Sequence, residues 1–317
     1  KTLRHRARIK AGTIYALTIK GNKSKKRRNM KFWKMNGTGN DFLIIDNSLL
    51  KIKQKDLPFL AKTLCERHHS IGADGLMIVE NEGEGSGADL KMLFFNNDGS
   101  TSEMCGNGAR CICRYAYENG FAGEEQRIET EAGIVTGRRI NESEYEIRLN
   151  TPCNIRLDEQ IECEGEILNC SYIELGNPGI PHIVVEIKGL KSFDEGKLYR
   201  IGAYLRSHKN YPKGANVNFY EKLADDHYYE RTFERGVEGF TLACGTGTGS
   251  LVSILTLKGE CNGKDIKVDI QGGRLIVNAE KKDGKIENLY LRGGTNVVCK
   301  GEVTDENIKG LVSTCEI

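Results

Sequence analysis

The sequence predicts an α+β fold with two similar lobes, each built from antiparallel sheet and a central helix. Stretches typical of short strands far outnumber those typical of helices, and they do not alternate as βαβ units would. A Cys-Gly-x-Gly segment followed by an apolar stretch occurs twice, at 105–120 and at 244–259. The chain has 317 residues, a length at which a single core tends to divide into domains.

The first half of the chain contains signals for several elements in succession. Those expected are a glycine-rich turn at 37–40, a strand from Phe42 to Ile45, a helix over 53–67, strands at 76–80 and 89–95, and a hairpin over 127–139. The helix is expected because the apolar residues between Leu57 and Leu64 recur on one face. A mobile turn is expected at 81–87, which is rich in glycine and glutamate.

The pattern begins again near residue 150. The elements expected there are strands at 171–175, 183–188 and 227–234, a helix near 198–207, and strands near 266–270, 274–279, 287–291 and 296–300. We therefore expect an N-terminal lobe over 30–149, to which a segment at about 295–317 returns, and a C-terminal lobe over 150–294. Residues 1–29 are interpreted as a basic leader, either flexible or non-native.

The charge distribution singles out this leader. Residues 1–29 hold eleven Lys and Arg and no acidic residue, whereas 30–317 carries a net charge of −9. A basic arm can bind nucleic acid, but no aromatic interleaving or folded basic motif accompanies this one, so no nucleic-acid partner is expected. No apolar run approaches the roughly 18 residues that a membrane span needs, and no signal peptide is recognised. We expect a cytoplasmic protein without a membrane partner.

The eleven cysteines do not resemble a disulfide framework, because their number is odd and their spacing irregular. No Cys-x-x-Cys pair or nearby histidine accompanies Cys105, Cys111 and Cys113, so no metal site is expected. The glycines at 245–249 do not fit G-x-G-x-x-G, and there is no Walker A sequence. The sequence thus predicts an enzyme without metal, nucleotide or other cofactor.

The repeated segments carry the chemistry. Each has a Gly fifteen residues after its cysteine, typical of a helix C-cap, and the second segment is apolar on nearly every face. A Gly-Asn pair also precedes each cysteine at similar range, with Asn40 before Cys105 and Asn177 before Cys244. Two copies of one unit would place each cysteine at the start of an equivalent helix.

A cysteine at a helix start is suited to proton transfer. The unsatisfied N–H groups and the partial positive charge there favour a thiolate, so we expect a pKa below the reference value of about 8.5. The same N–H groups, with glycines that allow close approach, suit a carboxylate. Cys105 and Cys244 on opposite faces of an amino-acid α-carbon could remove one proton and return another, which inverts the configuration. The remaining cysteines are interpreted as small buried side chains.

At these residues the chain resembles diaminopimelate epimerase, a pyridoxal-independent enzyme of lysine and peptidoglycan precursor synthesis. The matching blocks, in order, are KMNGTGNDF (34–42), RHHSIGADG (67–75), NNDGSTSEMCGNGAR (96–110), GNP with a following His (176–182), NVNF (216–219), and ERG with ACGTG (234–247). The resemblance implies lobes in which a barrel-like sheet wraps around the central helix, and it implies that Cys105 and Cys244 are the two acid/bases.

The resemblance also assigns substrate contacts. The backbone at Gly106, Asn107, Gly245 and Thr246 would hold the reacting carboxylate. The contacts expected chiefly at the distal end of the substrate come from Asn40, Asn96, Asn177, Asn216 and Arg235, with Glu234 near the distal ammonium and His182 in a supporting role. From composition alone, the Asn residues at 40, 96 and 177 would serve local turn geometry, and Glu234-Arg235 would be a solvated pair.

Two departures from the family pattern leave alternatives open. His182 lies three residues further along than in the shorter GNPH form, and the segment 234–247 is one residue longer, with Phe240 where a Glu often stands. A racemase of the same architecture for histidine, proline or hydroxyproline is one alternative, and a non-enzymatic binding protein with a regulatory disulfide is another. The sequence does not fix the oligomeric state, and a homodimer stays open.

Overall fold

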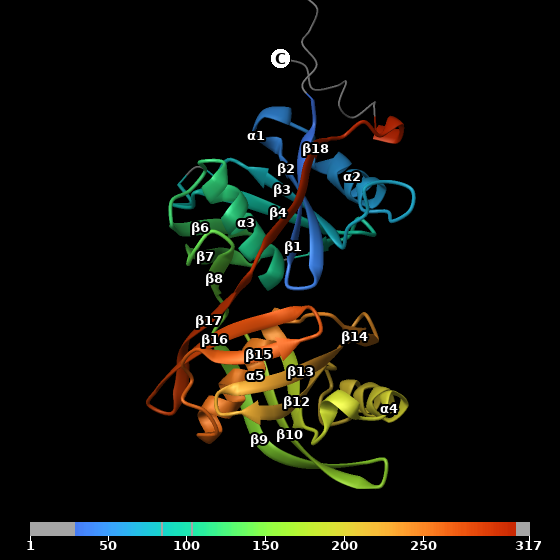
Figure 1. Ribbon diagram of the computed structural model, residues 1–317, viewed down its shortest axis with the longest axis vertical. Helices are drawn as coiled ribbons and strands as arrows, with labels where there is room; N and C mark the ends of the chain where they lie inside the picture. The colour runs from blue at the N-terminus through green and yellow to red at the C-terminus, as the bar shows by residue number, and fades with distance from the viewer. Residues whose placement is uncertain (1–28, 84, 103, 309–317) are drawn as a thin grey trace, which may run out of the picture.

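The computed structural model describes residues 29–83, 85–102 and 104–308. The basic leader, apart from its last residue, and the last nine residues lie outside the described part. Two lobes lie one above the other along the longest axis of the molecule, and the chain crosses between them (Figure 1). No helix in the described ranges is long and apolar enough to cross a bilayer.

One lobe contains the first half of the chain together with its last strand. Its strands are β1 (Lys31–Gly37), β2 (Asn40–Asp46), β3 (Gly75–Glu80), β4 (Leu90–Asn96), β5 (Thr101–Ser102), β6 (Glu125–Thr130), β7 (Gly133–Arg139), β8 (Glu144–Arg148) and β18 (Asn296–Glu302). Its helices are α1 (Asn47–Leu50), α2 (Leu57–Leu64) and α3 (Gly106–Glu118), with short 3₁₀ turns η1 (Gln54–Asp56) and η3 (Glu306–Ile308). We call this the N-terminal lobe.

The C-terminal lobe contains the remaining elements. Its strands are β9 (Pro152–Cys163), β10 (Glu166–Leu175), β11 (Ile180–Glu186), β12 (Asn216–Ala224), β13 (His227–Glu234), β14 (Gly239–Thr241), β15 (Ile266–Ile270), β16 (Gly273–Lys282) and β17 (Lys285–Gly294). Its helices are α4 (Glu195–Arg206) and α5 (Gly245–Lys258), with the 3₁₀ turn η2 (Leu190–Ser192).

The strand pairings repeat from one lobe to the other. The N-terminal lobe pairs its strands in the order β18-β1-β2-β3-β4-β6-β7-β8, with β5 added to β4. The C-terminal lobe follows the same series as β9-β10-β11-β12-β13-β15-β16-β17, with β14 added to β13. The predicted α+β fold with two similar lobes is confirmed. The sheet is mixed, because β2–β3, β4–β6, β11–β12 and β13–β15 are parallel pairs.

The lobes exchange strands and share one sheet. After β8 the chain enters the C-terminal lobe as its edge strand β9, and after β17 it returns to the N-terminal lobe as β18, which pairs with β1 (Figure 1). Strands β8 and β17 pair with each other, with Ile147 opposite Leu291. This pairing fixes the relative position of the two lobes.

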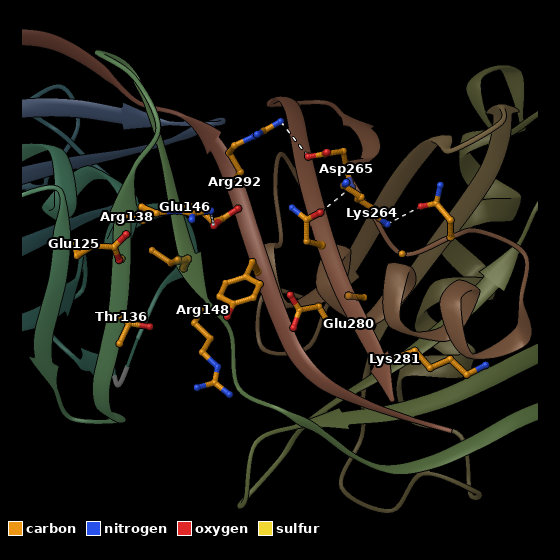
Figure 2. A pocket seen from close by; sticks show the side chains of 17 residues that line it. Glu125, Thr136, Arg138, Glu146, Arg148, Lys264, Asp265, Glu280, Lys281 and Arg292 are labelled. Atoms are coloured by element: carbon orange, nitrogen blue, oxygen red, sulfur yellow. Dashed lines mark hydrogen bonds and ion pairs between the residues drawn. The ribbon is translucent and has the colours of Figure 1, made fainter. Parts of the chain in front are cut away.

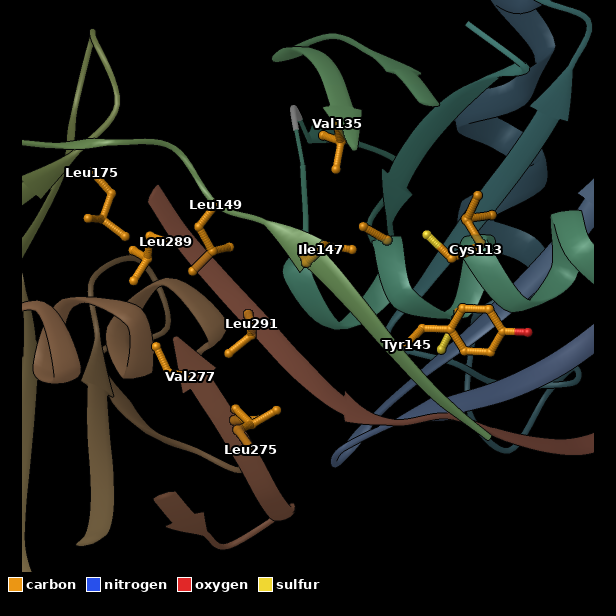
Figure 3. Close-up of a cluster of buried hydrophobic side chains, with 14 of the residues drawn as sticks. Cys113, Val135, Tyr145, Ile147, Leu149, Leu175, Leu275, Val277, Leu289 and Leu291 are labelled. Carbon is orange, nitrogen blue, oxygen red and sulfur yellow. The ribbon is translucent and has the colours of Figure 1, made fainter. Parts of the chain in front are cut away.

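The apolar core continues from one lobe into the other. Side chains of β8, β17 and the strand ends around them form the bridge, among them Ile147, Leu149, Leu289 and Leu291 (Figure 3). The same cluster surrounds both α3 and α5, which are buried within their lobes. Two smaller clusters lie beneath α2 and α4 on the outer sides of the sheets. The central helices are thus held on all sides, which fixes their first turns.

Local signals placed most helix ends correctly. Helix α5 ends at Gly259, whose φ of 77° is the left-handed C-cap that the sequence predicts. The matching prediction at Gly120 is confirmed too: its φ is 74°, and the N–H groups of Gly120 and Phe121 donate to the carbonyls of Tyr117 and Ala116, as those of Gly259 and Glu260 do after α5. The helix expected over 53–67 is shorter: Pro58 lies in the first turn of α2, and the residues before it form η1.

Candidate active site

The two cysteines of the repeat lie at equivalent places. Cys105 is the N-cap of α3 and follows β5, and Cys244 is the N-cap of α5 and follows β14. Both have extended backbone with φ of −131°. Neither side chain makes the N-cap hydrogen bond that often closes a helix start.

The two helix starts meet at a pair of glycines. A Cβ atom on Gly245 would lie 3.8 Å from the Gly106 Cα and only 2.8 Å from Leu291 Cδ2, so the space between the helices has no room for side chains. Gly247 is equally constrained, because a Cβ there would overlap the Asn218 side chain. These close approaches require glycine and bring the N–H groups of two first turns to one place. Paired N–H groups of this kind are suited to a carboxylate.

The thiol pKa values differ from the sequence expectation. Burial raises the pKa of Cys105, while the N–H groups of Gly108 and Asn107 and the charge of Arg110 act in the opposite direction. Burial raises the pKa of Cys244 well above its ordinary value, and the carboxyl of Glu234 adds to this. The helix start therefore lowers each pKa as predicted, but the loss of hydration outweighs it.

On the N-terminal side, amide and guanidinium groups join the first turn of α3 to the sheet. Asn107 is buried and donates to Asn40 Oδ1 at 2.8 Å, and Asn40 donates to Asp74 Oδ2 at 3.1 Å. The buried Arg110 donates to Asn107 Oδ1 at 2.8 Å and to Thr38 Oγ1 at 2.9 Å. In these contacts the predicted binding residues Asn40 and Asn107 hold the first turn of α3 in place.

On the C-terminal side, Glu234 ends β13 close to both thiols. It accepts a hydrogen bond from Thr241 Oγ1 at 2.6 Å, and its charge raises the pKa of both Cys105 and Cys244. Burial in turn raises the pKa of Glu234 itself. Thr246 Oγ1 lies 3.6 Å from the Cys244 sulfur. Glu234 therefore lies close enough to both thiols for its charge to act on each of them.

His182 lies beneath this site with one nitrogen unused. It is fully buried on β11, its Nδ1 lies 3.1 Å from the Asn218 amide nitrogen, and its Nε2 has no hydrogen-bond partner among the described residues. Burial, together with the charge of Arg235, lowers the pKa of His182 to about 3. It is therefore a neutral imidazole at physiological pH, suited to a supporting role.

The other predicted binding residues occupy the rim. Asn216 opens β12 opposite His182 and accepts from the Arg235 N–H at 2.9 Å, and the exposed Arg235 donates to the Lys213 carbonyl at 2.8 Å. Asn96 ends β4 and donates to Ser100 Oγ at 2.9 Å, and Asn177 is exposed in the turn between β10 and β11. The structure thus brings the cysteines and Glu234 together, places His182 behind Asn218 at the start of α5, and places Asn96 and Asn177 at strand ends.

Three buried polar residues of this region were missed from the sequence. Asn218, Arg110 and Glu230 all contact a first turn or its support, and all have partners from distant elements. The available signal for Asn218 and Glu230 was their place at the alternate positions of β12 and β13 that face the lobe interior. For Arg110, the signal was a charged residue in the first turn of a helix expected to be buried.

A cavity of about 800 Å³ lies elsewhere, between β7, β8, β16 and β17 (Figure 2). None of the predicted site residues lines it. Its charges pair locally, with Arg138 to Glu146 at 2.7 Å and Arg292 to Asp265 at 3.5 Å. Within the described ranges, no group of three His, Cys, Asp or Glu side chains is arranged to hold a metal ion.

Comparison with known proteins identifies one family across most of the chain. The family model of diaminopimelate epimerase matches residues 32–150 and 175–298. A diaminopimelate epimerase of Aquifex aeolicus is 34% identical over 87% of this chain and 99% of its own length. One of Alkaliphilus metalliredigens is 35% identical over 88% and 99%, and one of Archaeoglobus fulgidus is 34% identical over 85% and 95%.

Solved structures share the fold at low sequence identity. A phenazine biosynthesis protein of the PhzF family from Bacillus anthracis superposes with a TM-score of 0.68 at 17% identity, over 88% of this chain and all of that chain. A probable proline racemase from Agrobacterium radiobacter superposes with a TM-score of 0.61 at 17% identity, over 89% and 95%. At this identity the likeness supports the two-lobe architecture alone.

Proposed function

Because the chain belongs to the diaminopimelate epimerase family, we propose that it interconverts LL- and meso-2,6-diaminopimelate without a cofactor, using Cys105 and Cys244. The observation that carries this proposal is the meeting of two equivalent helix starts, each capped by a cysteine, at Gly106 and Gly245. The reaction would supply meso-diaminopimelate for lysine and peptidoglycan precursor synthesis. We place it in the cytoplasm, where thiols stay reduced.

The proposed step moves protons only. One cysteine, as thiolate, takes the α-proton and becomes a thiol, while the other gives its proton to the opposite face of the carbanion and becomes a thiolate. No electrons are transferred, and the cysteines have exchanged states when the inverted product leaves. A single base would return the proton to the face it came from, whereas two opposed groups invert the centre in one passage.

The substrate carboxylate would bind the N–H groups at Gly106, Asn107, Gly245 and Thr246. These dipoles would also stabilise the negative charge that spreads from the α-carbon into the carboxylate during proton transfer. Burial raises the pKa of both thiols, so the thiolate that takes the α-proton is a stronger base than an ordinary cysteine. Glu234 beside the thiols supplies an acceptor for a substrate ammonium.

The distal end of the substrate would meet the polar rim. Asn40, Asn96, Asn177, Asn216 and Arg235 remain the proposed contacts, with His182 supporting the floor of the site. Arg235 is exposed and offers a guanidinium suited to a second carboxylate. A substrate with a carboxylate and an ammonium at each end fits this distribution better than proline or histidine does. The homodimer remains a prediction.

The deciding experiment is hydrogen exchange in heavy water under reducing conditions. LL-diaminopimelate should gain one α-deuterium as it converts to the meso form, while L-proline and L-histidine should gain none. Cys105→Ala and Cys244→Ala should each lose at least about 10²-fold in epimerisation, because each removes a general acid/base. Cys299→Ala, at an exposed position on β18, is the control and should retain activity. Exchange with proline but not with diaminopimelate would refute the substrate, and full activity in both active-site variants would refute the mechanism.

A further inference from the structure

The duplicated frame allows the surroundings of the two cysteines to be compared position by position. In the N-terminal lobe, Leu90 of β4 pairs with β6 and Phe95 of β4 pairs with β5. In the C-terminal lobe, Tyr228 of β13 pairs with β15 and Phe233 of β13 pairs with β14 in the same way. Met92 and Glu230 are therefore equivalent residues, each on the strand face that carries residues packed around the central helix.

The helix residues at the position of Thr248, which contacts Glu230, differ in the same way. Ala109 and Thr248 each lie four residues after the cysteine of their lobe. The N-terminal lobe thus has an apolar pair, Met92 and Ala109, where the C-terminal lobe has a carboxyl and a hydroxyl, Glu230 and Thr248. All four side chains are buried, so the polar pair is not a surface variation.

Hydrogen-bond geometry connects this polar pair to Cys244. Thr248 Oγ1 lies 2.6 Å from Glu230 Oε2 and 3.1 Å from the Cys244 carbonyl oxygen. A hydroxyl has one proton and can donate to only one of the two oxygens. Both contacts are hydrogen bonds at once if Glu230 is protonated, donates to Thr248, and Thr248 donates to the Cys244 carbonyl. The other oxygen of Glu230 has no partner among the described residues, as suits an uncharged buried carboxyl.

We propose that Glu230 is a positioning residue for Cys244. In its protonated form it completes a hydrogen-bond chain that runs through Thr248 to the Cys244 carbonyl. When Glu230 loses that proton, a negative charge lies beneath the start of α5 and makes the Cys244 thiol harder to ionise. The inference rests on the proposed function for its catalytic meaning. The hydrogen-bond chain itself is independent of the substrate.

The electrostatics agree with this geometry. Burial raises the pKa of Glu230 to about 8, although the hydrogen bond with the Thr248 hydroxyl acts to lower it. The charge of Glu230 in turn raises the pKa of Cys244. The titratable groups on the same faces of the strands around it are Glu234 and Tyr228 on its own strand, Tyr220 and Lys222 on β12, and His182 and Glu186 on β11, with Cys244 at the start of α5. Lys222 pairs with Asp225, Arg231 lies on the opposite face of β13 and pairs with Glu195, and His182 is neutral, so none of these cations compensates an ionised Glu230.

The N-terminal lobe has the opposite arrangement. Arg110 is fully buried near Cys105, and its charge lowers the pKa of that thiol. Its equivalent after Cys244 is Gly249. The two thiols of a duplicated site are therefore unequal: a cation assists ionisation of Cys105, whereas an ionisable carboxyl opposes ionisation of Cys244.

The test measures the ionisation of each thiol directly. Wild type and Glu230→Gln are alkylated with iodoacetamide from pH 7 up to the highest pH at which both stay folded, the midpoints are fitted from the rise of the rate with pH, and the modification of Cys105 and Cys244 is followed separately by peptide mass spectrometry. Glutamine keeps a donor toward Thr248 and cannot ionise. We expect the Cys244 midpoint to fall by about one pH unit, the size expected for a nearby charge at an effective dielectric constant of about 20. The Cys105 midpoint should stay in place.

Controls separate this effect from a general change. Glu142→Gln, at an exposed position, should shift neither thiol. The double variant Glu230→Met with Thr248→Ala copies the N-terminal pair and should lower the Cys244 midpoint as well, which keeps the test open if the glutamine variant folds poorly. Infrared difference spectra should show a protonated carboxyl at pH 7 that is missing in Glu230→Gln.

Unchanged Cys244 midpoints in both Glu230 variants, or equal shifts of both cysteines, would overturn the inference. Because alkylation needs no substrate, such a result would leave the proposed epimerase activity intact. Loss of the substrate assignment in the exchange assay would likewise leave this measurement valid.

Discussion

Gly247→Ala tests how tightly the start of α5 is held. The new methyl group would overlap the Asn218 side-chain oxygen. That side chain is buried, and its three contacts are to His182 Nδ1, the Ile183 carbonyl and the Thr232 hydroxyl, each at 3.1 Å. Moving Asn218 away from the methyl group would break or stretch all three.

The expected cost follows from these bonds. A buried hydrogen bond contributes about 1 kcal/mol, so disturbing three costs about 3 kcal/mol. Alanine restores about 1 kcal/mol, because glycine in a helix is less favourable by that amount. We expect Gly247→Ala to lower the free energy of unfolding by about 2 kcal/mol, roughly a 30-fold change in the unfolding equilibrium.

The equivalent position in the other lobe is the matched control. A methyl group at Gly108 would meet the end of the Met77 side chain, which is flexible and can change rotamer. The overpacking should cost about 1 kcal/mol, and the better helix propensity of alanine should offset nearly all of it, so the free energy of unfolding of Gly108→Ala should stay close to that of wild type. Urea unfolding followed by the fluorescence of Trp33, the single tryptophan, gives both values. The reasoning fails if Gly108→Ala is as destabilised as Gly247→Ala, or if Gly247→Ala costs as much in an Asn218→Ala background as in wild type.

Two further predictions concern pH and stability. Burial holds the pKa of His182 at about 3 in the folded protein, so the neutral imidazole adds its full share to the free energy of unfolding above pH 6.5. That share is lost as the pH falls from 6.5 toward 3. The free energy of unfolding of wild type should therefore fall by about 2 kcal/mol more than that of His182→Gln between pH 7 and 5. Parallel curves in urea unfolding would contradict this. Glu230, with a pKa raised from 4.5 to about 8, contributes fully below 4.5 and progressively less as the pH rises through 8. Glu230→Gln should therefore gain on the order of 3 kcal/mol relative to wild type between pH 4 and 7, and a gain that does not change with pH would count against it.

The repeated segment made the fold class predictable, because its glycines and cysteines are local signals. Strands β9 and β12 were missed for different reasons. Most residues of β9 are partly or fully exposed, and the strand is held by its pairing with β10, a contact that local periodicity does not reveal. In β12 the polar residues Asn216 and Asn218 point into the lobe and interrupt the apolar alternation that signals a strand.

Part of the candidate site could be predicted from the sequence and part could not. Cys105, Cys244 and their glycines were predicted because the residues that mark a helix start are adjacent in the chain. Asn218, Arg110 and Glu230 each have a partner in another element, and these partners lie between 14 and 72 residues away along the chain. The raised thiol pKa values were also out of reach, since burial of the helix starts depends on how the lobes close on one another.

Duplication alone would give two similar thiols, and a two-base reaction needs them in opposite protonation states. Two identical sites would each hold a proton with equal affinity, so the productive state with one proton would compete with states holding two or none. Two differences between the lobes break this equality. Near Cys105 the helix has Arg110 where the other lobe has Gly249, and near Cys244 the strand has Glu230 where the other lobe has Met92. Because both groups act from within the lobes, the first turns that would bind the carboxylate in the proposed reaction keep their matching geometry, while the affinities of the two thiols for the proton differ.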